Sequence, residues 1–169
     1  MIYKLIGTVL LLMTGGYVSL YVNRFERRRL EVLDGYISLI GYIKGQIDCY
    51  AMPLADILAR ADPALIAACL GVEYRSQPPA YRMWDRGDPL STLLRESRLY
   101  LEPECERLLI TFTGELGTTY RAEQVARCAY YIEALTRERN KLAEHLPARL
   151  RTCGTLCMCC AVAAAVLLW

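Results

Sequence analysis

LIGTVLLLMTGGYVSLYV, residues 5–22, is the stretch that decides the fold. Its eighteen positions carry no charge. As a helix it would be roughly 27 Å long, close to the roughly 30 Å thickness of a bilayer's hydrocarbon core. A buried helix of a soluble domain rarely runs that far without a polar face. The stretch therefore predicts a transmembrane helix, which we assign to residues 1–23.

The flanking charges favour a retained anchor over the alternative, a cleaved signal peptide. A signal peptide carries positive charge before an apolar region of about 7–15 residues and ends at a small-x-small cleavage site. Here only Lys4 precedes the stretch, and no such site follows it. The residues that follow form a basic cluster, and Lys and Arg beside a span tend to stay in the cytoplasm. This cluster consists of Arg24, Arg27, Arg28 and Arg29.

A second uncharged stretch runs over the last eighteen residues, from Thr152 to Trp169. Arg149 and Arg151 stand just before it, so we predict a second transmembrane helix over residues 149–169. The arginines of both stretches place the middle of the chain in the cytoplasm and both termini outside.

Residues 24–148 have the apolar periodicity of several amphipathic helices. Leu33, Ile37 and Ile40 recur at three- and four-residue steps in the first of them, and its wide apolar side predicts packing against other helices. Prolines at the first position of a helix mark further starts. These are Pro53, Pro63, Pro89 and Pro103. The fold class we predict is all-α: a cytoplasmic helical bundle between N- and C-terminal transmembrane helices.

Other signals set the ends of individual helices. Asp62 and Pro63 start one helix, which Gly71 ends, and Asp88 is the N-cap of the helix that begins at Pro89. We expect a loop over residues 73–79 and a short helix over residues 80–86. A long last helix runs to about Leu146, where Pro147 either kinks it or restarts it.

Eight cysteines raise the question of a metal or redox site. Four of them stand singly, and a cytoplasmic location keeps thiols reduced, so we expect them to be buried as small apolar side chains. The other four fall in the last uncharged stretch. A membrane-bound metal or redox protein that uses these C-terminal cysteines is the alternative function. We expect no cofactor and no metal.

The two uncharged stretches also carry small residues at helical spacing. Gly15 and Ser19 form a small-x-x-x-small pair, and Cys157 and Ala161 belong to a similar stripe in the second stretch. Small residues let membrane helices approach closely. We therefore predict that the two helices pack as a hairpin.

Catalytic motifs are missing from the sequence. It contains no P-loop, no dinucleotide fingerprint, no G-x-S-x-G and no H-E-x-x-H, and it has a single histidine, His145. The net charge of +2 is too small to indicate nucleic-acid binding. We predict a non-enzymatic protein whose membrane-fixed helical surface positions partners.

The order of several segments resembles the stage III sporulation protein AB family of endospore-forming bacteria. The resemblance covers nearly the whole chain, including the start KLIGTVLLLMTGGYVSLYVNRFERRRLEVLDGYISLIGYI, the run FTGELGTTYRAEQVARCAYYIEAL and the end LRTCGTLCMCCAVAAAVLLW. The positions that carry it are Pro53 and Leu54 at a helix start, then Glu115, Leu116, Gly117 and Gln124.

That family in turn resembles the cytoplasmic domain of the type II secretion system F protein. Gly114, Glu115 and Gly117 partly match its Gly-Glu-x-x-Gly stretch, with the second glycine one place early. The resemblance implies a platform in the channel between mother cell and forespore. It would sit in the mother-cell membrane, which becomes the outer forespore membrane. Implied partners are a secretion-type ATPase, stage III sporulation protein AA, and other stage III sporulation membrane proteins; homo-oligomerisation stays open.

Overall fold

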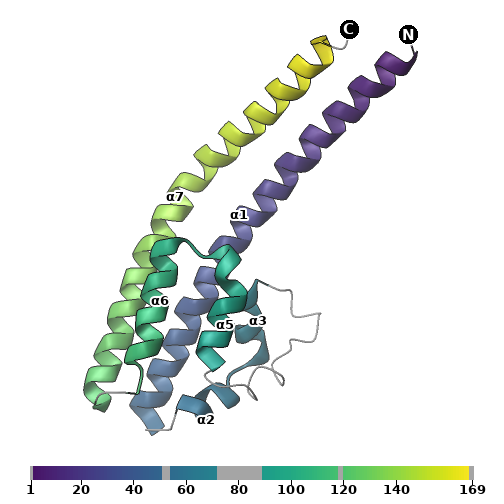
Figure 1. Cartoon of the computed structure of the whole chain (residues 1–169). Helices are drawn as coiled ribbons and strands as arrows, with labels where there is room; N and C mark the ends of the chain where they lie inside the picture. Colours follow the sequence, from purple (N-terminus) through teal and green to yellow (C-terminus); the bar gives the residue numbers. More distant parts are fainter. Residues whose placement is uncertain (1, 51–53, 72–88, 118–119, 168–169) are drawn as a thin grey trace. The chain divides into compact units, whose positions relative to one another are not determined.

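The computed structural model describes residues 2–50, 54–71, 89–117 and 120–167 (Figure 1). Inside these ranges the description covers the backbone alone at residues 2–6, 8–12, 54–55, 59, 89, 153, 157, 161 and 164–167. Every regular element within the described ranges is a helix, which confirms the predicted all-α class.

The helices divide into two compact units. We call residues 28–141 the core unit, and residues 1–27 with residues 142–169 the arm unit. Helices α1 (Ile2–Tyr50) and α7 (Arg121–Leu167) contribute to both, because neither helix is broken where the units divide. The predicted boundaries at residues 23 and 148 stay predictions.

Helix α1 supplies the centre of the core unit. Seven of its side chains recur at three- and four-residue steps and are buried: Val32, Leu33, Tyr36, Leu39, Ile40, Ile43 and Ile47. This confirms the predicted apolar face. Gly35 lies on the same face, and a Cβ placed there would come within 2.8 Å of the backbone of Ala68 and Cys69. The absence of a side chain at residue 35 therefore lets α1 approach α3 (Pro63–Leu70) closely.

Helix α3 begins and ends at the predicted residues. The Asp62 Oδ1 accepts a hydrogen bond from the Ala64 backbone N–H at 2.9 Å, and Pro63 occupies the first turn. Gly71 closes the helix with a φ of 64°, the left-handed conformation that glycine adopts without steric cost. Local sequence signals therefore define both ends of this helix.

Three short elements complete this side of the core unit: α2 (Leu54–Ala59), α5 (Pro89–Ser97) and the 3-10 turn η1 (Arg98–Tyr100). Helix α5 contacts both α3 and α6 (Pro103–Glu115). The predicted helix start at Pro53, the loop over residues 73–79, the short helix over residues 80–86 and the N-cap Asp88 lie outside the described residues.

Helix α6 begins at Pro103 as predicted, and the chain then turns into α7 through Gly117, whose φ is 84°. Helix α7 runs through Pro147 to Leu167, so of the two alternatives at this proline the restart is wrong, and the kink stays a prediction. Proline removes one N–H donor from the hydrogen bonds of the helix. The hydrogen bonds of the neighbouring turns remain, so a proline can lie inside a helix without ending it.

A buried hydrogen bond ties α1 to α5 inside the core. Ser97 is a polar residue that is fully buried among the described side chains. Its Oγ donates to the Leu94 carbonyl at 3.2 Å. Because the serine hydroxyl has a single proton, the Tyr36 hydroxyl must donate to Ser97 Oγ across their 2.6 Å contact. Burial raises the pKa of Tyr36 above its ordinary value, so the tyrosine stays a donor.

The arm unit consists of the first part of α1 and the last part of α7. A Cβ on Gly154 would lie 3.5 Å from Ser19 Oγ, an ordinary contact distance. Large apolar side chains are exposed on both arms: Met13, Tyr17, Val18, Leu20, Tyr21, Leu156, Met158 and Val162. Among the described residues, no helix is both long enough and apolar enough to cross a membrane.

The core cysteines lead to a first prediction. Of the four single cysteines that we expected to be buried, Cys69, Cys105 and Cys128 are buried, but the expectation is wrong for Cys49, which is exposed near the end of α1. Burial raises the pKa of Cys69 to about 12 and that of Cys105 to about 11. Because the thiolate is the reactive form, these three thiols should resist alkylation at neutral pH, whereas the exposed Cys49 of the core unit should react. Mass spectrometry after a brief iodoacetamide pulse on the native full-length protein measures each site. Rapid labelling of the three buried thiols would contradict this packing.

Candidate functional site

The turn from α6 to α7 brings together three of the positions that carry the family resemblance. Glu115, Leu116 and Gln124 line one hollow in the core unit, with an empty volume of about 180 Å³ that includes space open to solvent. Phe112, Arg127 and Tyr131 complete its lining. Gly117, which also carries the family resemblance, follows Leu116 and has a positive φ of 84°, a conformation that glycine adopts readily.

Glu115 is the centre of the polar contacts in this hollow. Its Oε2 accepts a hydrogen bond from the Tyr131 hydroxyl at 2.9 Å and lies 3.1 Å from Arg127 Nη1. The Nη2 of the same arginine donates to Glu123 Oε1 at 2.8 Å. One guanidinium therefore serves two carboxylates, which gives these three side chains a net charge of −1.

Aromatic rings support the inner side of the same site. The Phe112 and Tyr131 rings pack edge to face with centroids 5.2 Å apart, and Tyr130 packs edge to face on Tyr131 at 5.4 Å. Such pairs add specific geometry to the burial of apolar area. Tyr131 is thus held by two rings and by Glu115, which fixes the position of its hydroxyl.

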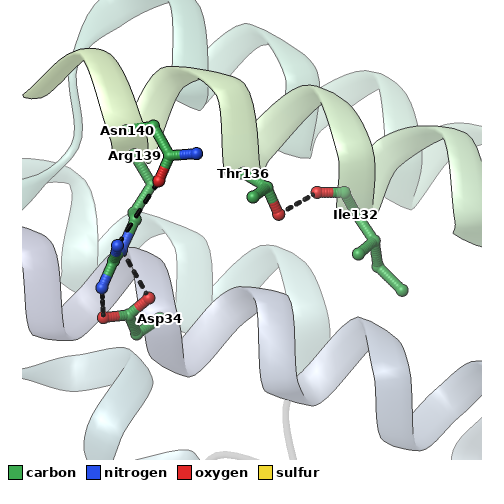
Figure 2. Close-up of polar contacts among 5 residues, drawn as sticks. All are labelled: Asp34, Ile132, Thr136, Arg139 and Asn140. Atoms are coloured by element: carbon green, nitrogen blue, oxygen red, sulfur yellow. Dashed lines mark hydrogen bonds and ion pairs between the residues drawn. The ribbon is translucent and has the colours of Figure 1, made fainter.

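A second polar contact joins α1 to α7 in the core unit (Figure 2). Arg139 donates from Nε to Asp34 Oδ1 at 3.0 Å and from Nη2 to Asp34 Oδ2 at 3.2 Å, a bidentate pairing. Its Nη1 donates to Asn140 Oδ1 at 3.4 Å, and one turn earlier Thr136 donates to the Ile132 carbonyl. The planar guanidinium thereby joins α1 and α7 at this point.

Arg29 plays a part in the core unit that the basic cluster does not predict. Its Nε donates to the Tyr100 carbonyl at 3.3 Å and its Nη2 lies 3.1 Å from Glu102 Oε1, with 13% of the side chain exposed. The remaining arginines assigned to membrane orientation are exposed: Arg24, Arg27, Arg28, Arg149 and Arg151. Arg29 therefore fastens α1 to the start of α6.

The family model for stage III sporulation protein AB matches residues 4–169 of the chain. The chain belongs to the stage III sporulation protein AB family. Membership confirms the resemblance and gives the protein a role in stage III of sporulation. Neither the curated proteins nor the solved structures contain a match to the chain. The likeness to the type II secretion system F protein therefore rests on sequence resemblance.

The structure leaves several predicted positions of this stage III sporulation protein AB family member untested. Pro53 lies outside the described residues, and the side chains of Leu54, Cys157 and Ala161 lie outside the description. Gly15 and Ser19 are half-buried in the arm unit. The predicted packing of these small residues stays a prediction.

The described side chains of this family member form pairs of opposite charge rather than an acid–base dyad. Glu102, Glu104 and Glu106 each lie beside an arginine: Arg29, Arg107 and Arg98, at 3.1, 3.8 and 2.6 Å. Over the same part of the chain, no three His, Cys, Asp or Glu side chains are grouped closely enough to hold a metal ion. The arrangement is suited to fixing helices and presenting a surface.

Four residues of these sites in this stage III sporulation protein AB family member were not predicted from the sequence: Arg127, Tyr131, Asp34 and Arg139. Gln124, Arg127 and Tyr131 follow one another at three- and four-residue steps, a spacing that puts them on one face of α7. That spacing was the available signal for the hollow. No comparable signal links Asp34 to Arg139, because they are 105 residues apart.

A second prediction concerns Tyr131, whose pKa is raised to about 12 by burial and by its hydrogen bond to Glu115. The native state therefore holds the proton more tightly than the unfolded state does. The resulting contribution to stability is complete below pH about 10, the ordinary tyrosine pKa, and is lost as pH rises from there through about 12. Tyr131→Phe should cost about 1–3 kcal/mol of unfolding free energy at neutral pH, because it removes a hydrogen bond to a charged group.

Urea unfolding of the full-length protein at neutral pH measures the cost of Tyr131→Phe. The difference in tyrosinate absorbance between wild type and variant as pH rises measures the pKa. Tyr120→Phe is the matched control, because 89% of that side chain is exposed and it should leave stability unchanged. Equal stability of Tyr131→Phe and the control would contradict the role of the hydroxyl.

Proposed function

We propose that the protein is a non-enzymatic platform of the channel between mother cell and forespore. The two predicted transmembrane helices, residues 1–23 and 149–169, cross the mother-cell membrane, which becomes the outer forespore membrane. The core unit faces the mother-cell cytoplasm. There it docks a secretion-type ATPase, stage III sporulation protein AA, alongside other stage III sporulation membrane proteins. The family membership and the two uncharged stretches with their flanking arginines support this proposal.

The observation that carries the proposal is the continuity of α1 and α7. Each is a single helix that belongs to the arm unit at one end and to the core unit at the other. A flexible linker between two units would absorb movement, and helical backbone stands in place of such a linker in both α1 and α7. In the proposal, an ATPase that acts on the core unit acts on the same two helices that carry the membrane segments.

Contacts within the core unit join α1 and α7 to each other and to α6. Arg139 pairs with Asp34 between α7 and α1, and Arg29 fixes α1 to Glu102 at the start of α6. Buried apolar side chains fill the space between these helices, including Leu39, Ile43 and Leu135. A partner that binds one helix of the core unit thus acts on the whole unit.

Two measurements on the full-length protein test the proposal. The protein should stay in the membrane pellet of sporulating cells after alkaline carbonate extraction. Purified in detergent, it should retain the ATPase in a pull-down, and metal analysis of the same sample separates the platform from the metal or redox alternative. Release by carbonate, or failure to retain the ATPase, would overturn the proposal.

A further inference from the structure

Three arginines of the arm unit lie at nearly the same level along its two helices. Ser19 and Gly154 mark where the helices meet, because a Cβ on Gly154 would lie 3.5 Å from Ser19 Oγ. From this contact, α1 continues into the core unit, and α7 reaches the contact from the core unit. At about 1.5 Å per residue, Arg24 and Arg27 lie about 8 and 12 Å along α1 from the contact, and Arg151 lies about 5 Å from it along α7. All three are on the side where the helices continue into the core unit, and we call them the arginine belt.

The arginine belt is exposed and belongs to a unit with excess positive charge. Arg27 Nε donates to Asn23 Oδ1 at 3.1 Å on the surface of α1. The arm unit contains five Lys and Arg side chains and two acidic ones, Glu26 and Glu144. Its net charge is therefore +3, whatever pairs these two acids form within the unit. A guanidinium presents planar N–H donors that match the oxygens of a phosphate group.

Large apolar side chains are exposed next to the arginine belt, on the side away from the core unit. On α1, Leu20 and Tyr21 are 62% and 63% exposed, and on α7, Leu156 and Met158 are 62% and 52% exposed. The sequence has no charged residue in positions 5–22 or 152–169. An apolar surface bounded by arginines is typical of the level where lipid hydrocarbon meets the headgroups, and tyrosine is enriched at that level.

We infer that the arginine belt binds the phosphate groups of anionic phospholipids in the leaflet that faces the core unit. The inference rests on the proposed function, because it requires the two predicted transmembrane helices to enter the membrane, and it adds the class of lipid that the protein selects. A zwitterionic headgroup carries a positive group beside its phosphate, so charge complementarity favours lipids with a net negative charge. A nucleic acid or an acidic protein would meet the arginines but leave the neighbouring apolar side chains in water.

The lipids that the full-length protein retains test this inference. The protein is reconstituted into vesicles of equal parts phosphatidylglycerol and phosphatidylcholine, extracted in a mild non-ionic detergent and purified. Mass spectrometry of the retained lipids gives the ratio of the two. Wild type should enrich phosphatidylglycerol about fivefold or more, the effect expected from a single arginine near an anionic surface. The triple variant Arg24→Gln, Arg27→Gln and Arg151→Gln should fall to within about twofold of the ratio in the vesicles.

Two further triple variants serve as controls. Arg60→Gln, Arg95→Gln and Arg137→Gln together remove the same charge from exposed positions of the core unit and should keep the enrichment of wild type. Lysine at the three positions of the arginine belt keeps the charge and should keep most of the enrichment, which separates the loss of charge from a loss of packing. Circular dichroism establishes that each variant is folded.

Glycerol 3-phosphate distinguishes a lipid site from a site for soluble phosphate esters, because it has the phosphate without the acyl chains. At a tenfold molar excess over lipid during purification, it should leave the retained phosphatidylglycerol unchanged. Displacement of the lipid would mean that the arginine belt binds soluble phosphate esters, and the inference would be overturned.

The outcomes separate the lipid site from the function on which it rests. If carbonate releases wild type from the membrane, the proposed function falls and the lipid site falls with it. If wild type stays in the membrane and retains the ATPase but does not enrich phosphatidylglycerol, the lipid site alone is wrong. Equal loss of enrichment in the glutamine variants of the arginine belt and of the core unit would also refute the lipid site, because net charge alone would then explain the effect.

Discussion

Phe112→Ala should lower the unfolding free energy by about 3–5 kcal/mol, the cost typical of removing a buried phenylalanine side chain. Phe112 is 1% exposed and packs on the Tyr131 ring with centroids 5.2 Å apart. The substitution loses this contact and leaves a cavity at the junction of α6 and α7. It also removes the support that holds Tyr131 against Glu115, so the loss of stability and the loss of site geometry should appear together.

Ile110→Ala is the control for this experiment, because it shortens another apolar side chain of α6 that is 52% exposed. Exposed substitutions away from special features usually change stability by about 0.5 kcal/mol or less. Urea unfolding of the full-length protein in detergent, followed by circular dichroism, measures both variants. Similar losses at the two positions would mean that Phe112 does not occupy the core described above.

Gly35→Ala should destabilise the protein by about 1–3 kcal/mol, the usual cost of forcing extra atoms into a filled core. The new Cβ would lie 2.8 Å from the Ala68 carbonyl carbon and 2.8 Å from the Cys69 nitrogen. Both are backbone atoms, so no side chain can rotate away, and α1 must separate from α3. A larger residue at this position should cost more.

Gly41→Ala makes the same change on the same helix with the opposite expected sign. Residue 41 is exposed and a Cβ there meets nothing within 4 Å, so alanine should stabilise α1 by about 0.8–1 kcal/mol through its higher helix propensity. The two midpoints in a urea titration should therefore move in opposite directions. If Gly35→Ala also stabilises the protein, α1 and α3 are not in close contact at this point.

The helices that the sequence predicts correctly are those whose start and end signals are local. Asp62, Pro63 and Gly71 bound α3 within ten residues, and the structure uses all three as expected. The buried face of α1 was also predictable, because an apolar side chain every three or four residues is a property of one helix. At Pro147 the general rule about proline was too coarse to distinguish a restart from a continuous helix.

Contacts between distant residues could not be predicted in this way. Arg29 counts as one of four arginines in a basic cluster until the fold places the Tyr100 carbonyl and Glu102 beside it. Nothing in the sequence distinguishes Asp34 and Arg139 from the other charged residues of their helices. They form a bidentate pair only when α1 and α7 pack together. Three residues that line the hollow, Glu115, Leu116 and Gln124, carry the family resemblance, but nothing in the sequence indicated that they share a hollow or that the Tyr131 hydroxyl donates to Glu115.

The unbroken course of α1 and α7 also determines what happens when the chain is shortened. Cutting before Arg28 and after Lys141 would divide two continuous helices and leave unpaired N–H groups at one new end and unpaired carbonyls at the other. Arg28 and Arg29 would then stand at a helix N-terminus, where the helix dipole disfavours positive charge. An excised core unit would fray at both cut ends, and a serine or aspartate added as an N-cap before residue 28 would restore part of the lost stability.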